Sequence, residues 1–219
     1  MLISTLFSDP ILFIAVVIAI VYAISVHEFS HALGAYIQGD KTAQYEGRLT
    51  LNPFAHLDPI GFLLVLVAGF GWGKPTPFNP YNLRNQRFGP AIVGVFGPLS
   101  NFVSGVLFGL ILWGVSESGM AADTLLPEFL SVIVFVNFLL GIFNLIPIPP
   151  LDGAKIFFPF FPRSFDNLKM TLERFGPQIL MGIIFLDILL PGSFFAFVRD
   201  MALNLTSIFL PGSRTTIGG

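Results

Sequence analysis

The stretch "AISVHEFSHALGA", residues 23–35, follows directly on the apolar run "ILFIAVVIAIVY", residues 11–22. It places Glu28 between His27 and His31, which are two of the only three histidines in the chain. Polar and ionisable side chains inside an apolar segment are costly unless a partner compensates them. An interpretation of this chain therefore has to say what compensates these three groups and what they do.

The helix that carries this stretch is predicted to run from about Pro10 to Ile37. Proline suits a first helical turn, and Gly39 with the aspartate after it suits a helix end. The predicted helix exceeds the roughly 20 apolar residues that a membrane span needs. The N-terminus has neither a basic region nor a small-residue cleavage site, so we expect a retained helix rather than a removed signal peptide.

Composition points to the same environment. The chain has 219 residues, mean hydropathy +0.80 and 11% charged residues, whereas soluble domains carry about 25%. We therefore predict an all-α polytopic membrane protein. The net charge of −2 argues against nucleic-acid binding, and the absence of cysteine excludes disulfides and thiolate metal sites.

We predict about five to six transmembrane or re-entrant helical segments. After the first helix, the apolar segments lie at about residues 60–72, 90–115, 129–145, 154–162 and 178–198. The first of these is too short to span comfortably, which favours a re-entrant or tilted segment. The region 41–88 leaves room for a short β-hairpin. Toward the C-terminus we expect a charged linker at 163–174, an interfacial tail at 197–212 and a frayed end at 213–219.

Charges in the loops predict the orientation. The charged residues between the segments at 90–115 and 129–145 are all acidic. The other ends of these two segments are flanked by basic residues: Lys74, Arg84, Arg87, Lys155, Arg163, Lys169 and Arg174. The positive-inside rule puts those ends on the cytoplasmic side. His27, His31 and the "PPLDG" segment at 149–153 then share the cytoplasmic half of the bilayer.

The pattern H-E-x-x-H predicts a metal centre. His27 and His31 are four residues apart, which places both imidazoles on one helix face where they can bind one zinc ion. Glu28 is then placed to act as general base on a metal-activated water. The alternative is a pair of core histidines satisfied by hydrogen bonds, but it leaves the adjacent Glu28 unexplained.

Zinc also needs a third protein ligand, and the residues alone leave three candidates. Asp152 ends "NLIPIPPLDG", residues 144–153, whose prolines disfavour regular helix at membrane depth. Its alternative role is to cap the helix that follows. Asp187 lies within the last apolar segment and is interpreted as a packing or cavity carboxylate, and His56 is the remaining histidine.

These motifs together resemble the site-2 protease family of intramembrane zinc metallopeptidases. The similarity rests on "HEFSH" and "NLIPIPPLDG", supported by "LNPFAHLDPIG", "GWGKPTPFNPYNLRN" and "GPLSN". It covers about residues 10–155 and is closest to the compact prokaryotic members. Members of the family often carry a PDZ module, for which we see no room between the predicted segments, so we expect the compact type without one. We expect one intramembrane metalloprotease domain over 1–219, with its catalytic core at about 10–155 and C-terminal helices at about 156–212.

The resemblance implies roles for individual residues. It makes His27, His31 and Asp152 the ligands of one zinc ion per chain, and Glu28 the base. It also implies that Asn144 holds the substrate or the oxyanion, where the alternative is a helix C-cap.

Two further residues are less determined by the resemblance. His56 either lines the site, or orients a metal ligand by contacting it, or is a polar residue at the membrane surface. Asn101, in "GPLSN", is interpreted as a helix-packing residue.

We therefore expect an intramembrane zinc metalloprotease of a prokaryotic cell membrane, whose partners are the lipid bilayer and a membrane-protein substrate with a transmembrane helix. The "GWGKPTPFNP" segment, residues 71–80, either presents an extended edge to the substrate or is an inert loop. The alternatives are a family-like protein that binds metal without cleaving, a metal or ion transporter, and a membrane scaffold. The substrate and the oligomeric state do not follow from the residues.

Overall fold

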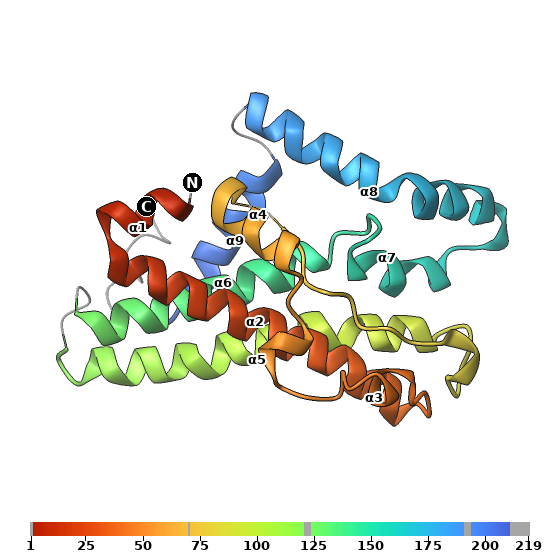
Figure 1. Ribbon diagram of the computed structural model, residues 1–219, viewed down its shortest axis with the longest axis horizontal. Coiled ribbons are helices and arrows are strands. Elements are labelled where there is room, and N and C mark those ends of the chain that lie inside the picture. Colours follow the sequence, from red (N-terminus) through yellow and green to blue (C-terminus); the bar gives the residue numbers. More distant parts are fainter. Residues whose placement is uncertain (1, 70, 121–123, 191–193, 211–219) are drawn as a thin grey trace.

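The computed structural model describes residues 2–69, 71–120, 124–190 and 194–210, and helices make up most of this part of the chain (Figure 1). Within that part, three helices are long and apolar enough to cross a membrane: α2 (Pro10–Ile37), α5 (Gly89–Glu117) and α6 (Leu125–Asn144). No β-strand is assigned in the same ranges. The predicted all-α membrane class is confirmed.

The bounds of α2 match the predicted ones, and local chemistry explains them. The Asp9 carboxylate accepts a hydrogen bond from the Leu12 N–H at 2.9 Å, and Pro10 occupies the first helical position. The helix stops before Gly39, whose φ of +103° is a conformation that side chains with a Cβ rarely adopt.

The three long helices lie side by side with similar axes, and α5 contacts both of the others (Figure 1). Small residues allow their close approach. A Cβ on Gly105 of α5 would lie 2.7 Å from the Phe138 ring of α6, so only glycine fits there. Through this close packing, α5 lies against both α2 and α6. The polar side chains of α2 lie at its contact with α5.

A hydrophobic core fills the end of the bundle away from these polar side chains. It joins α5 and α6 to the C-terminal helix α9 (Phe194–Ser207) and consists of Leu112, Leu130, Val134, Phe138 and Ala202. The tail predicted at 197–212 is a packed helix in its part 197–207, because α9 buries Val198 and Ala202 against the bundle, and its place at the membrane interface stays a prediction. The end expected to fray, 213–219, lies outside the described residues.

Shorter helices surround the bundle. They are α1 (Leu2–Ser8), α3 (Thr42–Tyr45), α4 (Pro59–Ala68), α7 (Asp152–Phe157) and the short 3-10 turns η1 (Pro53–Ala55), η2 (Pro80–Asn82), η3 (Phe158–Phe160) and η4 (Arg163–Phe165). The ten-residue α4 is too short to cross a bilayer, as expected for a re-entrant or tilted segment.

The region 41–88 does not form the hairpin for which it left room. Its described residues contain one isolated antiparallel bridge, between Leu57 and Gly73, in place of two paired strands. The chain between these two residues is mostly taken up by α4. The chain returns tightly over α4: a Cβ on Gly61 would lie 2.1 Å from the Trp72 carbonyl oxygen. Prolines before and after Thr76 remove two of the N–H donors that a ladder would need.

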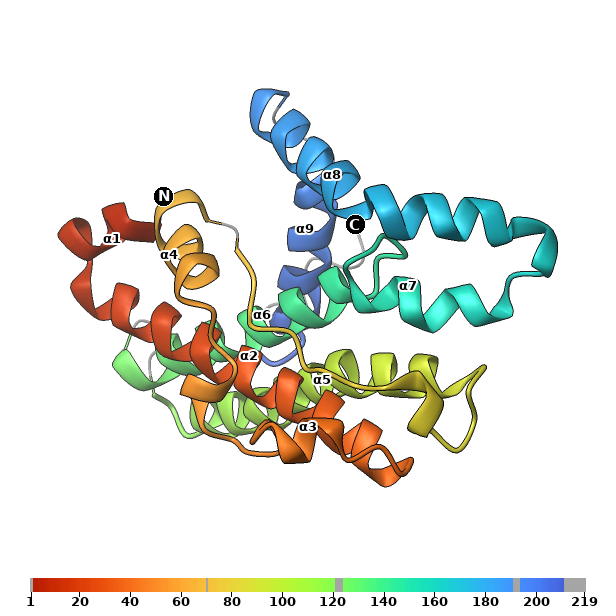
Figure 2. The same cartoon turned by 45° about the vertical axis from the view of Figure 1, so that its right-hand side comes forward.

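The predicted linker at 163–174 is also corrected. Most of it forms the first part of α8 (Asp166–Leu189), which lies outside the bundle above α7 (Figure 2). Asp166 at the start of α8 and Lys169 one turn later suit a helix N-terminus, since a carboxylate is favourable there and an i,i+3 pair stabilises the turn.

Candidate metal centre

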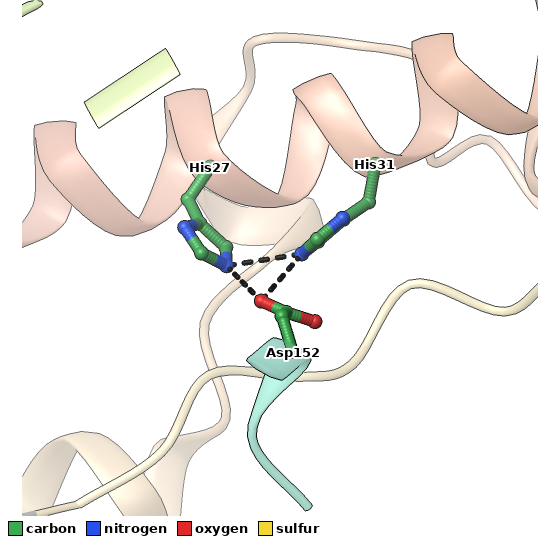
Figure 3. Close-up of side chains that lie close together, drawn as sticks. All are labelled: His27, His31 and Asp152. Atoms are coloured by element: carbon green, nitrogen blue, oxygen red, sulfur yellow. Dashed lines mark hydrogen bonds and ion pairs between the residues drawn. The ribbon is translucent and has the colours of Figure 1, made fainter. Parts of the chain in front are cut away.

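Two histidines of α2 and one aspartate of α7 converge on a single point (Figure 3). The Asp152 Oδ2 atom lies 2.9 Å from His27 Nε2 and 3.0 Å from His31 Nε2, and the two Nε2 atoms are 3.0 Å apart. All three residues are buried. Asp152 lies 125 residues after His27 and 121 residues after His31, so it is the fold that brings the three side chains together.

The other nitrogen of each ring is tied to α5. His27 Nδ1 donates to Asn101 Oδ1 at 2.6 Å, and His31 Nδ1 donates to the Val93 carbonyl oxygen at 2.7 Å. The orientation of the Asn101 amide is fixed, because its Nδ2 donates to Ala23 O and to Asn137 Oδ1. Each Nδ1 therefore carries a proton, so in its neutral form each imidazole presents an Nε2 lone pair to Asp152.

This arrangement suits a cation. With both imidazoles neutral, two Nε2 lone pairs and a carboxylate oxygen form a set of three acceptors. Tetrahedral zinc with ligands at about 2.0–2.1 Å places ligand atoms about 3.3 Å apart, close to the spacings of 2.9–3.0 Å seen here. Two imidazoles and one carboxylate are also a donor set that zinc accepts, with a fourth position left for water or substrate.

Gly97 of α5 leaves the room that this cluster needs. A Cβ at this position would lie 2.4 Å from His31 Nε2 and 2.7 Å from His27 Nε2. Any side chain would therefore occupy the space in front of the ligand atoms. The glycine of "GPLSN" keeps that space open, while Asn101 at the end of the same motif orients His27.

Asp152 reaches the cluster because of the turn that precedes it. α6 ends at Asn144, and the proline-rich residues 145–151 lead into α7, which begins with Asp152 itself. Gly153 allows the close approach, since a Cβ there would lie 2.3 Å from the Leu145 carbonyl oxygen. The alternative capping role is wrong: Leu151 is the N-cap, no side chain caps the helix, and the Asp152 carboxylate contacts the histidines and Lys155 instead.

Glu28 is held by Thr76, which lies in the segment between α4 and α5. Its Oε2 accepts a hydrogen bond from the Thr76 N–H at 2.8 Å, and the Thr76 hydroxyl donates to the Glu28 carbonyl oxygen at 2.9 Å. Glu28 is half-buried and lines a cavity of about 190 Å³ that His27, His31 and Asp152 also line. A carboxylate and three potential ligands thus face one enclosed space.

Asn144 lines the same cavity from the end of α6. Its Nδ2 donates to Leu140 O one turn earlier, at 3.0 Å. Asn144 is the last residue of α6 and the helix cap is Leu145, so the side chain bonds back along its own helix. Its position beside the cavity is compatible with the role that the resemblance implies, and that role stays a prediction.

His56 and Asp187 lie apart from this cluster. His56 is fully buried, so the alternative of a polar residue at the membrane surface is wrong. Its Nε2 donates to Thr50 O at 2.7 Å, and its Nδ1 has no partner within the described ranges. Burial, together with the charge of Arg48, lowers the pKa of His56 below its ordinary value. Asp187 belongs to α8, and its Oδ1 lies 3.4 Å from the Phe195 N–H of α9.

Four contacts of the centre were not foreseen. Asn101 was interpreted as a packing residue, although an amide inside an apolar helix is a signal for a polar partner. The ion pair between Lys155 and Asp152 could have been predicted from their i,i+3 spacing. The Val93 carbonyl and the Thr76 N–H are backbone groups, which no side-chain pattern in the sequence could indicate.

Comparison with known proteins gives one family model and several relatives. The model of peptidase family M50 matches residues 112–186, a range that includes Asn144 and Asp152. "Putative zinc metalloprotease YwhC" of Bacillus subtilis is 39% identical over 164 residues, which cover 73% of this chain and 75% of that protein.

Two mycobacterial relatives share a name. "Putative zinc metalloprotease Rip2" of Mycolicibacterium smegmatis is 31% identical over 180 residues, covering 78% of this chain and 67% of the relative. Its namesake from Mycobacterium tuberculosis is 25% identical over 195 residues, or 85% and 72% of the two chains. No solved structure matches significantly.

Proposed function

The chain belongs to peptidase family M50, the family of the site-2 proteases, and from this premise we propose that it is a zinc metalloendopeptidase that cleaves membrane proteins. The scissile bond lies in or near a transmembrane segment of the substrate. The single observation that carries the proposal is the convergence of His27, His31 and Asp152 beside Glu28, in one cavity next to the apolar bundle.

The proposed ligands would bind the metal through atoms that the neighbouring hydrogen bonds orient. His27 and His31 would hold one zinc ion per chain through Nε2, and Asp152 through Oδ2. When bound, zinc supplies a Lewis acid that polarises the scissile carbonyl and makes a water molecule more acidic. Asn101 and the Val93 carbonyl keep both rings in the tautomer that this requires.

Glu28 moves the proton. Its carboxylate takes a proton from the attacking water and passes it to the nitrogen of the leaving amine as the C–N bond breaks. One water and one peptide bond are consumed, and one carboxylate and one amine are produced. The Thr76 N–H holds Oε2, which leaves Oε1 as the freer oxygen for this transfer.

The substrate must be extended where it is cut, because a helical carbonyl is hydrogen-bonded and shielded by its own helix. We propose that residues 73–75 present a backbone edge to it. The Lys74 N–H is used by His56 O at 2.8 Å, while Gly73 and Pro75 line the cavity. Asn144, on the opposite wall, would donate to the developing oxyanion once its bond to Leu140 O is released.

The remaining features of the proposal follow from charge and sequence position. The basic residues around 74–87 and 155–174 support an orientation with the centre toward the cytoplasmic side, in a prokaryotic cell membrane as the resemblance implies. All proposed ligands and Glu28 fall within the core at about residues 10–155, with helices from about 156 to 212 as a C-terminal addition. We propose that 1–219 acts as one intramembrane protease domain.

The proposal is tested by reconstituting the chain in proteoliposomes with a single-span reporter protein. Cleavage should require zinc: chelation should abolish it and added zinc should restore it. Mass spectrometry of the products should locate the cut within or next to the reporter's transmembrane segment. Cleavage that persists after complete removal of metal, or that falls only in exposed loops, would contradict the proposal.

A further inference from the structure

The two carboxylate oxygens of Asp152 have different partners. Oδ2 faces both imidazoles, whereas Oδ1 accepts a hydrogen bond from Lys155 Nζ at 2.9 Å. The lysine stands three residues later in the first turn of α7, so the pair closes within one helical turn. The oxygen that does not face the imidazoles is therefore already occupied.

The position of the lysine is set by packing and not only by charge. A Cβ on Gly94 of α5 would lie 3.2 Å from Lys155 Cβ, so the base of the side chain is held against α5. The Asp152 side chain is 5% exposed and that of Lys155 is 38% exposed. The ammonium group thus reaches a buried carboxylate from a partly solvated position.

Lys155 also lies where two spaces meet. It lines the 190 Å³ cavity of the metal centre and a neighbouring groove of about 510 Å³, along with Phe78, Pro150 and Leu151. A cation at this junction compensates Asp152 without occupying the space in front of the imidazoles.

We propose that Lys155 is a positioning residue for the metal centre, which keeps Asp152 a one-oxygen ligand and holds its carboxylate ready for zinc. This rests on the proposed zinc site. With Oδ1 bound to Lys155, only Oδ2 is offered to the metal, so the place that a second carboxylate oxygen would take stays open for water and substrate. The ammonium group acts through Asp152 and does not touch the reacting atoms.

The chain contains a matched pair for comparison. Lys169 and Asp166 of α8 have the same i,i+3 spacing and the same 2.9 Å separation. There the carboxylate is 55% exposed and faces no histidine. Exposed pairs of this kind contribute little to stability. Lys169→Met therefore removes an equivalent ion pair without touching the centre.

The test measures zinc affinity, by competition with a chromophoric chelator at pH 7, on full-length protein in detergent. Lys155→Met should weaken zinc binding by about 10–100-fold, the usual effect of removing a partner that orients a ligand. Lys155→Arg should recover most of the loss, and Lys169→Met should bind as tightly as the wild type. If Lys155→Met does not fold, Lys155→Gln is measured instead, with a loss of at least about 10-fold expected.

Cobalt gives a readout of coordination that a general structural role would not change. Co²⁺ in wild type and in Lys155→Arg should give the strong visible absorption of four-coordinate sites, and Lys155→Met the weaker absorption of five-coordinate ones. Zinc affinities within twofold of wild type in Lys155→Met and Lys155→Gln would overturn the proposal, as would equal losses in the Lys169→Met control. The proteolytic proposal is judged separately, because wild-type cleavage does not enter this comparison.

Discussion

The histidines and Glu28 lie within a little over one turn of α2, yet different kinds of structure hold them. The imidazoles are fixed by α5, through the Asn101 side chain and the Val93 carbonyl, both inside the helical bundle. Glu28 is fixed by the Thr76 N–H, which belongs to an extended segment outside the bundle. The metal ligands therefore depend on helix packing, and the base depends on a loop.

That loop has its own supports. Residue 74 is held on both sides, since its N–H donates to His56 O and its carbonyl accepts from Arg48. Both supporting residues, His56 and Arg48, are buried. The comparison teaches that metal binding and proton transfer should be separable: changes in the bundle should affect zinc, and changes in the loop should affect rate.

The sharpest separation is expected at Glu28. Glu28→Gln should keep zinc at one ion per chain and lower the cleavage rate by about 100- to 10,000-fold, the usual range for a lost general base. Zinc content and reporter cleavage are measured on the same sample. Glu46→Gln is the matched control, because Glu46 is exposed on the loop after α3. Undiminished cleavage by Glu28→Gln would refute this residue as the base.

On the bundle side, Asn101→Leu should weaken zinc binding by about 10–100-fold, since His27 Nδ1 loses its acceptor and the ring is no longer oriented. Asn137→Leu is the control one step further away, because Asn137 contacts Asn101 but no ligand. Chelator competition should rank the wild type first, Asn137→Leu second and Asn101→Leu last. Equal affinities in all three would show that the tautomer is fixed in another way.

On the loop side, Thr76→Pro removes the N–H that holds Glu28 and should lower the cleavage rate about 10-fold, less than loss of the base itself. Zinc affinity should not change, because no ligand contacts Thr76. Thr76→Val keeps the N–H and loses only the hydroxyl, so it should be the milder of the two variants in the cleavage assay. A loss of zinc in Thr76→Pro would mean that loop and bundle are not independent.

The smallest expected effect is on stability and concerns the far end of the loop, next to the end of α2. There the Asp40 carboxylate accepts hydrogen bonds from the Asn79 N–H at 2.7 Å and from Asn82 Nδ2 at 3.0 Å. Burial alone would raise the pKa of Asp40, but these bonds and those from Thr42 hold it below its ordinary value. A carboxyl with a lowered folded-state pKa stabilises the protein above its unfolded pKa of about 3.9, and the gain is lost as pH falls through the folded value.

Asp40→Asn should therefore lower the free energy of unfolding at pH 7 by about 1–3 kcal/mol and flatten its decline in acid. Thermal unfolding between about pH 7 and about pH 2 measures both, because the decline falls below the unfolded pKa of about 3.9. Asp166→Asn, at an exposed carboxyl, should behave as the wild type. A pH dependence in Asp40→Asn as steep as in the wild type would remove Asp40 from this role.

The features that could be read from the sequence are those set by local chemistry. Pro10 and Gly39 mark both ends of α2, and the four-residue spacing of the histidines places them on one face. The turn before Asp152 follows from its prolines, and the resemblance to a known family pointed to this aspartate rather than Asp187 as the third member of the cluster.

The rest depends on contacts between distant segments. The burial of His56 arises from the fold of the loop around it, and no periodicity signals it. The first part of α8 has the charges of a linker, but those charges suit an exposed helix equally well. The packing of α9 on the bundle could not be predicted, because the residues it buries there, including Val198 and Ala202, form a narrow face whose partners lie on α5 and α6.

The claim on which all of this depends is that one zinc ion is held jointly by α2 and α7. Zinc per chain, measured by mass spectrometry of metals after dialysis against buffered zinc, tests it most directly in the wild type and in Asp152→Ala. We predict one zinc in the wild type and essentially none in the variant, with both proteins folded by circular dichroism. One zinc in both would contradict the account, because α7 would then not contribute to the site.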